Sequence, residues 1–110
     1  MGHLGELEQL ILFAVIALGE DAYGGAIRAH IEERSGRVVS SGAISTTLGR
    51  LAERRLVVGH VGAPVPGQAA RPRKYYTPAG ARDLQESYTT IRAMAGGLLQ
   101  RINALAEQGS

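Results

Sequence analysis

The chain has 110 residues, with 12 lysines and arginines against 10 acids, no cysteine and a formal net charge of +2. This length suits a single domain with one modest core. The lack of cysteine excludes disulfides, thiolate metal ligands and a cysteine nucleophile. The most apolar run, residues 10–18, is shorter than a membrane span and follows two glutamates rather than bases. We therefore expect neither a membrane anchor nor a signal peptide, and a cytoplasmic location.

The charges are unevenly distributed along the chain. Residues 1–22 carry four acids and no base, whereas residues 23–62 carry six arginines against three acids. Residues 63–77 add three bases and no acid, and residues 78–110 are balanced. Positive charge concentrated in the middle of a chain favours a polyanionic partner such as DNA.

Two helices are predicted in the first third of the chain. Residues 4–18 place seven apolar side chains on one wide helical face: Leu4, Leu7, Leu10, Ile11, Ala14, Val15 and Leu18. Gly19 is expected to end this helix, because glycine takes a positive φ without strain. Asp21 then predicts the N-cap of a second helix over residues 22–34, which Gly36 would end.

A third helix is predicted over residues 41–54, which we call the reading helix. Its apolar residues Ile44, Leu48 and Leu51 follow the spacing of a buried helical face, and Ser40 or Ser41 suits the N-cap. The outer arc holds Ser45, Thr46, Gly49, Arg50 and Glu53, with Thr47 and Arg54 at its edge. Small residues, hydroxyls and arginine suit insertion into a DNA groove, although an ordinary surface helix fits this segment equally well by itself. Together, the three helices follow the order of a helix-turn-helix.

A β-hairpin is predicted next, from a strand over residues 56–61, a Pro- and Gly-containing loop, and a basic strand over residues 71–77. A hairpin with a basic tip beside a reading helix is typical of a wing. Arg71, Arg73 and Lys74 would then lie along phosphates. The alternative is a solvated hairpin whose edge is protected by charge.

The last predicted element is one long helix over residues 78–107, with Thr77 as N-cap and Pro78 at its first position. A heptad seam runs along it through Leu84, Tyr88, Ile91, Ala95, Leu98, Ile102 and Leu105. Such a helix would be roughly 45 Å long at 1.5 Å per residue, too long for so small a body to cover. We expect two copies to pair through this seam as a two-fold dimer. The alternative is a monomer whose seam folds back on residues 4–18, and Gly96-Gly97 marks either a close crossing or a bend.

The fold class predicted is mainly α, within α+β: a winged helix-turn-helix over residues 1–77 with a two-stranded wing, followed by a long C-terminal dimerisation helix over residues 78–110. The chain at this point resembles the PadR-like family of bacterial winged-helix transcription regulators. The matching segments are residues 4–12, 19–24, 41–44, 47–51 and 56–57, together with the basic residues 71–76 and residues 77–80. The resemblance implies a homodimer that binds near-palindromic operator DNA and usually represses, in the short form with a single C-terminal helix.

Two positions depart from the family's pattern. Ser45 stands where the family usually has a tyrosine in the reading helix, so any contact made by that tyrosine is lost or replaced. The family's wing usually ends in Tyr-x-Leu-Thr-Pro, whereas Tyr75-Tyr76-Thr77-Pro78 is shorter. Either tyrosine could be the matching one, and the last wing strand could be cut short.

We expect no enzymatic activity, no cofactor and no metal. The histidines His3, His30 and His60 lack the spacing of metal ligands, although His30 and His60 could join Glu32 or Glu33 in a sensor site. No nucleophile-elbow or phosphate-binding loop motif is present. The rival function is a winged-helix module for protein contacts alone, which the basic wing disfavours because protein interface cores are depleted in charge.

The sequence thus predicts a dimeric, sequence-specific DNA-binding regulator, most simply a repressor. Thr46, Thr47 and Arg50 are the leading candidates for base contacts. The full set of predicted DNA contacts is Tyr23, Gly24, Arg28, Ser40, Ser41, Gly42, Ser45, Thr46, Thr47, Arg50, Arg71, Arg73 and Lys74. A small-molecule effector, if one exists, would act between the first and last helices. The candidates to line its site are Leu10, Ala14, Tyr88 and Met94.

Overall fold

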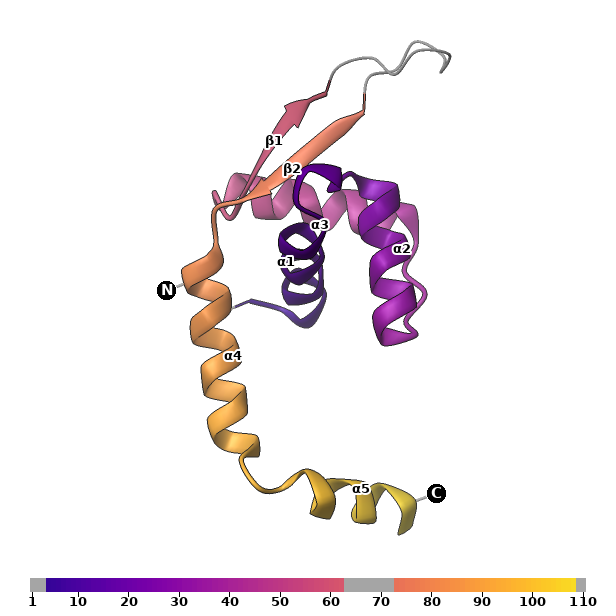
Figure 1. Cartoon of the computed structure of the whole chain (residues 1–110), viewed down its shortest axis with the longest axis vertical. Helices are drawn as coiled ribbons and strands as arrows, with labels where there is room; N and C mark the ends of the chain where they lie inside the picture. The colour runs from indigo at the N-terminus through magenta and orange to yellow at the C-terminus, as the bar shows by residue number, and fades with distance from the viewer. Residues whose placement is uncertain (1–3, 63–72, 109–110) are drawn as a thin grey trace.

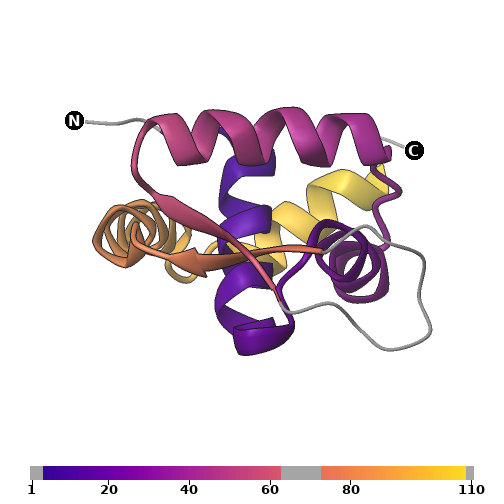
Figure 2. The ribbon, with the colours of Figure 1, turned by 90° about the horizontal axis from the view of Figure 1, so that it is seen from above.

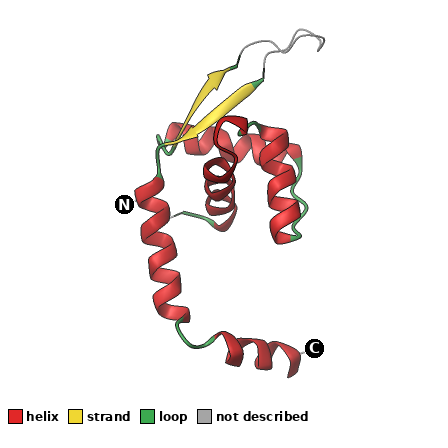
Figure 3. Cartoon of the chain, in the orientation of Figure 1, coloured by secondary structure: helices red, strands yellow, loops and turns green. Residues whose placement is uncertain are grey.

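A computed structural model describes residues 4–62 and 73–108. In these residues the chain forms five α-helices, one short 3₁₀ helix and a two-stranded antiparallel sheet (Figures 1 and 3). The elements are α1 (Glu6–Leu18), η1 (Gly19–Asp21), α2 (Gly24–Ser35), α3 (Ser41–Glu53), β1 (Val57–Val61), β2 (Lys74–Pro78), α4 (Ala81–Ala95) and α5 (Leu99–Gln108). This is the predicted winged helix-turn-helix architecture, with a different C-terminal end.

The core lies where α1, α2 and α3 meet, with the root of the hairpin and the start of α4 closing it. The fully buried large side chains come from the segment before α1, from all three helices and from β1: Leu4, Ile11, Leu12, Val15, Ile27, Ile44, Leu48, Leu51 and Val57. Each contributes about 1.5–3 kcal/mol by leaving water, so α1 and the reading helix are fixed chiefly by apolar burial. The sequence analysis missed Leu12, which is 1% exposed and shows that α1 is buried on more than one face.

The helix ends follow the predicted local chemistry in three places. Gly19 and Gly36 end α1 and α2 with φ values of +57° and +74°, in the region that favours glycine. Ser40 is the N-cap of α3, and its hydroxyl accepts a 3.1 Å hydrogen bond from the Ala43 backbone N–H. The predicted choice between Ser40 and Ser41 therefore resolves to Ser40.

The start of α2 differs from the prediction. Asp21 lies in η1 and Tyr23, rather than Asp21, is the N-cap of α2. Tyr23 stays extended because it forms an isolated antiparallel bridge with Tyr75, and the Tyr76 N–H donates a 2.8 Å hydrogen bond to the Ala22 carbonyl. The second wing strand therefore delays the helix by two residues and joins the wing to α2.

The hairpin of β1 and β2, which we call the wing, pairs Val57 with Pro78 at its root and Val61 with Lys74 toward its tip. The predicted N-cap and first helical turn at Thr77 and Pro78 are wrong, because both residues belong to β2 and α4 begins at Ala81. The Gly80 position explains the delay. A Cβ there would lie 2.8 Å from Leu56 Cδ2 and 3.2 Å from Leu56 Cα, so the chain leaves the strand through a tight glycine contact.

The single long C-terminal helix is also wrong: it is divided at Gly96-Gly97 into α4 and α5. Gly97 has a φ of +78°, which stops helical continuation, and the Leu98 N–H returns to the Ala95 carbonyl at 2.8 Å. α4 runs down one side of the body and α5 turns beneath it (Figures 1 and 2). The glycine pair therefore marks a bend, one of the two alternatives. Within the described ranges, no helix is both long and apolar enough to cross a membrane.

Candidate nucleic-acid interface

The reading helix α3 has one buried and one exposed face. Ile44, Leu48 and Leu51 are buried as predicted, whereas Ser45, Thr46, Gly49, Arg50 and Glu53 are exposed. Thr47 departs from the prediction: it is 7% exposed and lies with the apolar residues. Its spacing from Ile44, Leu48 and Leu51 is that of a core face, so Thr47 is withdrawn as a candidate DNA contact.

Residues near the start of α2 lie beside the first turn of α3. Arg28 Nη1 donates a 3.0 Å hydrogen bond to Ser41 Oγ, and both residues stand on the exposed side of this junction. A Cβ at Gly24 or Gly42 would meet no atom within 4 Å, so the fold leaves open space at both positions. The structure thus brings together the predicted residues of α2 and α3.

The wing adds cations to the same region. The Arg73 guanidinium carbon lies 4.2 Å from the centre of the Tyr23 ring, and Lys74 Nζ lies 5.8 Å from the centre of the Tyr76 ring. Burial raises the pKa of the Tyr76 phenol above its usual value, so this ring stays neutral beside the cation. Arg71 lies outside the described residues.

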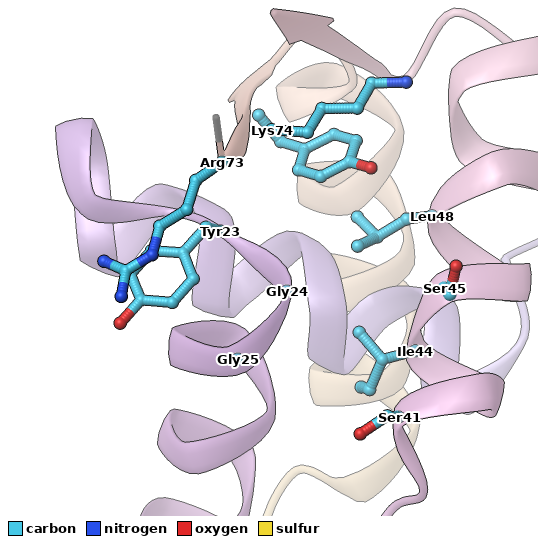
Figure 4. A pocket seen from close by; sticks show the side chains of 10 residues that line it. Tyr23, Gly24, Gly25, Ser41, Ile44, Ser45, Leu48, Arg73 and Lys74 are labelled. Atoms are coloured by element: carbon cyan, nitrogen blue, oxygen red, sulfur yellow. The ribbon is translucent and has the colours of Figure 1, made fainter. Parts of the chain in front are cut away.

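An open hollow of about 300 Å³ connects α2, α3 and β2. Figure 4 shows Arg73 over the Tyr23 ring at one side of it and Ser41 and Ser45 from α3 at the other. Its floor is apolar and its rim carries hydroxyls and two cations. The lining residues are Tyr23, Gly24, Gly25, Ser41, Ile44, Ser45, Leu48, Arg73, Lys74 and Tyr76. Hydroxyls, arginine and lysine are the groups that bind phosphates and base edges, so this surface has the chemistry of a DNA contact.

A second hollow of about 710 Å³ lies on the opposite face of the wing, as the alternation of side chains along β2 requires. Tyr75 and Thr77 face it from β2, together with Glu20 and Asp21 from η1. Among the described residues that line it there are two carboxylates and no lysine or arginine, and carboxylates repel a phosphate backbone. The face of the first hollow is therefore the candidate interface.

The predicted effector residues do not form one site in this chain. Ala14 is completely buried in the core and Leu10 packs against that core, whereas Met94 is 76% exposed near the end of α4. Tyr88 is half exposed and contacts Phe13 edge to face, with ring centres 6.3 Å apart. Ala14 is therefore corrected from an effector candidate to a core residue.

Two of the three histidines, His30 and His60, lie in the described part of the chain. His60 stacks on Tyr75 with ring centres 6.1 Å apart, and His30 is partly buried on α2. No group of three or more His, Asp or Glu side chains that could hold a metal ion occurs in the described part of the chain. His3 lies outside that part.

Two ion pairs join basic residues of the middle third to α1, and the sequence analysis missed both. Arg54 Nη1 lies 2.8 Å from Glu8 Oε2, and Arg37 pairs with Glu6. The acidic start of the chain thus neutralises two of the arginines that flank the reading helix, Arg37 before it and Arg54 at its end. Pairs separated by 46 and 31 residues leave no local signal in the sequence.

Comparison with solved structures places this geometry in a class. A PadR family transcription regulator from Clostridium difficile shares 21% identity and a TM-score of 0.73, over 89% of this chain and 99% of that chain. A PadR-like transcriptional regulator from Bacillus cereus shares 28% identity and a TM-score of 0.65, over 86% and 91% of the two chains. A PadR family transcriptional regulator from Eggerthella lenta shares 23% identity and a TM-score of 0.66, over 88% and 86%. No family model matches the sequence, and no curated protein matches it significantly.

The fold is thus a winged helix-turn-helix. It is similar to the fold of several solved PadR-family transcription regulators. The three similar proteins are each named as transcription regulators.

Proposed function

We propose that the protein is a dimeric, sequence-specific DNA-binding transcription regulator that represses by occupying a palindromic operator. One observation supports this most strongly. Ser41 and Ser45 on the exposed side of the reading helix, the start of α2 and the two described wing cations line a single hollow on one side of the fold. Arg50 lies on the exposed face of α3 but does not line the hollow. In this proposal Arg50 reads a base, and Arg73 and Lys74 bind flanking phosphates.

The glycines of this face also support close approach of a partner. Gly24, Gly42 and Gly49 sit in helices at some cost in stability, about 1 kcal/mol each relative to alanine. A Cβ at any of them would point into open space, so internal packing does not require glycine there. A DNA backbone lying against the helices would leave no room for a Cβ and would therefore require glycine at these positions.

The dimer is proposed from the exposed apolar residues of α4 and α5. Apart from Leu84, the large apolar residues of α4, α5 and the turn between them are exposed, and so are Phe13 and Ile16 on α1. The exposed set on α4, α5 and the turn between them is Tyr88, Ile91, Met94, Leu98, Leu99, Ile102 and Leu105. A second copy would cover this surface and place two reading helices at half-sites about 34 Å apart. Residues 1–77 would then bind DNA and residues 78–110 would dimerise, in the cytoplasm, with any effector acting at their junction.

The dimer can be tested by sedimentation. Ile102→Asp places a charge on the exposed apolar surface of α5 and should convert the dimer to a monomer. Asn103→Asp introduces the same charge at the neighbouring polar position and should leave the dimer intact. A monomeric wild-type protein at micromolar concentration would overturn the dimer.

DNA binding can be tested by fluorescence anisotropy with the duplex upstream of the protein's own gene and a scrambled duplex of equal composition. We expect tighter binding to the upstream duplex, by a factor of roughly 10³ or more for a specific site. Equal and weak binding to both would leave an architectural role or another operator. No binding to either at low salt would overturn the proposal in favour of a protein-interaction module.

A further inference from the structure

At the end of the wing strands nearer the tip, a stack of four side chains crosses from one face of the fold to the other. Arg73 Cζ lies 4.2 Å from the Tyr23 ring centre, and the Tyr23 and Tyr75 rings meet edge to face at 5.7 Å. His60 stacks on the far side of Tyr75, with ring centres 6.1 Å apart and planes inclined by 24°. The stack therefore runs Arg73, Tyr23, Tyr75, His60.

Tyr75 is the member that the backbone holds most firmly. It pairs with His60 in the wing register and with Tyr23 in the isolated bridge, so both neighbouring rings are attached to the strand that carries it. Its ring also lies against Gly62, where an added Cβ would come within 2.7 Å of Tyr75 Cδ1. A side chain at position 62 would therefore push the ring away.

The Arg73 backbone is held by the wing, because its carbonyl accepts a 2.8 Å hydrogen bond from the Gly62 N–H, but its side chain rests on the Tyr23 ring. Arg73 stands just before β2, and its guanidinium rests on the Tyr23 ring at the rim of the hollow that faces α3 (Figure 4). An arginine that rests on a fixed ring loses less side-chain freedom when it binds a phosphate than one that is free in solvent.

We propose that Tyr75 is a positioning residue for DNA binding: it fixes the Tyr23 ring and thereby sets the place at which Arg73 meets the DNA backbone. This inference rests on the proposed function, because Arg73 must contact DNA for its position to matter. Tyr75 itself faces the opposite hollow, between His60 and η1, and acts through the two side chains between it and the DNA.

A double-mutant cycle on DNA affinity tests the proposal. Arg73→Ala should weaken binding about tenfold and Tyr75→Leu about fivefold, whereas Arg73→Ala/Tyr75→Leu should be no weaker than Arg73→Ala within about twofold. Tyr75→Phe keeps the ring and should bind within about twofold of wild type. Losses that multiply in the double variant would overturn the proposal, because a purely structural Tyr75 would act independently of Arg73.

Lys74 supplies a matched control. Its ammonium lies over Tyr76 rather than on the stack, so the losses from Lys74→Ala and Tyr75→Leu should multiply. Gly62→Ala is a second way to move the ring, with no change to Tyr75 itself, and it should lose its effect in the Arg73→Ala background. Coupling of Tyr75 to Lys74 instead of Arg73 would overturn the proposal.

The free protein gives an independent measurement. The Tyr23 ring current should shift the NMR signals of the Arg73 Cδ protons upfield in wild type and in Tyr75→Phe, but not in Tyr75→Leu. An unchanged shift in Tyr75→Leu would overturn the positioning role even if DNA binds. Absence of DNA binding by wild type would overturn the proposed function and this role together, whereas binding with independent losses would overturn this role alone.

Discussion

Arg28 on α2 donates a 3.0 Å hydrogen bond to Ser41 at the first turn of α3, and this contact joins the two helices at the surface proposed to face DNA. The bond leaves the remaining guanidinium N–H groups of Arg28 available to phosphate oxygens. It also links the start of the reading helix to α2 at the surface. The same pair therefore places a cation at the N-terminal end of α3.

Arg50→Ala should relax operator discrimination. Arg50 is exposed in the last turn of α3, where its guanidinium can form a bidentate contact with a guanine. We expect a loss of about 1–3 kcal/mol on the preferred duplex and a smaller one on the scrambled duplex, measured by anisotropy. Arg34→Ala, an exposed arginine at the last turn of α2, is the control and should bind as wild type. Equal losses on both duplexes would show that Arg50 contacts phosphate only.

Lys74→Ala should weaken binding to all duplexes alike. A lysine that binds phosphate carries no sequence information, and its removal lowers the slope of log K against log salt by about one. The measurement is a titration at four salt concentrations with both duplexes. A loss confined to the preferred duplex would mean that Lys74 reads a base.

Much of the fold was accessible from the sequence because its signals are local. Apolar spacing predicted α1 and α3, glycine predicted the ends of α1 and α2, and the N-cap of α3 was narrowed to Ser40 or Ser41. The shift in the start of α2 was not accessible, since it results from the bridge between Tyr23 and Tyr75, 52 residues apart in the chain. A local capping signal at Asp21 could not reveal this long-range contact.

The candidate site was predicted in part for the same reason. The exposed residues of α3 and the wing cations follow from periodicity and charge, whereas the stack through Tyr75 depends on the hairpin register. The burial of Thr47 could have been predicted from its spacing, because it shares a helical face with Ile44, Leu48 and Leu51. Its hydroxyl instead led to its assignment to the exposed, DNA-facing arc. The heptad seam could not predict the break at Gly96-Gly97, because the spacing of its apolar residues in the sequence is the same whether the helix is straight or bent.

Ser40→Ala should destabilise the reading helix. The Ser40 hydroxyl is the cap acceptor for the Ala43 N–H, and alanine cannot replace it. We expect a loss of about 1 kcal/mol in the free energy of unfolding, measured with urea. Ser45→Ala changes an exposed serine of the same helix and should not destabilise the protein. An equal loss in both variants would assign the effect to the exposed surface rather than to the cap.

Gly97→Ala should favour a straight C-terminal helix. Its φ of +78° strains any residue with a Cβ, whereas alanine is favoured over glycine in a continuous helix by about 1 kcal/mol. The chain has no cysteine, so spin labels at Arg82→Cys and Gln100→Cys, measured in doubly labelled protein diluted with excess unlabelled protein, report the separation of α4 and α5 within one chain. We expect a longer and narrower distance distribution in Gly97→Ala. Gly5→Ala, a glycine before α1 with ordinary φ, should leave the distribution unchanged. The same distribution in Gly97→Ala would show that the bend does not depend on the glycine.

The central claim is that the face formed by α3, the start of α2 and the wing binds DNA electrostatically and specifically. Its most direct test is the salt dependence of binding to the upstream duplex, for wild type and for a variant with Arg50, Arg73 and Lys74 all replaced by alanine. The wild type should show log K falling steeply with log salt, by about 0.9 for each phosphate neutralised, and the variant should lose about three of those contacts together with discrimination. A wild-type protein that binds no duplex at low salt, or a variant with an unchanged slope and affinity, would contradict it.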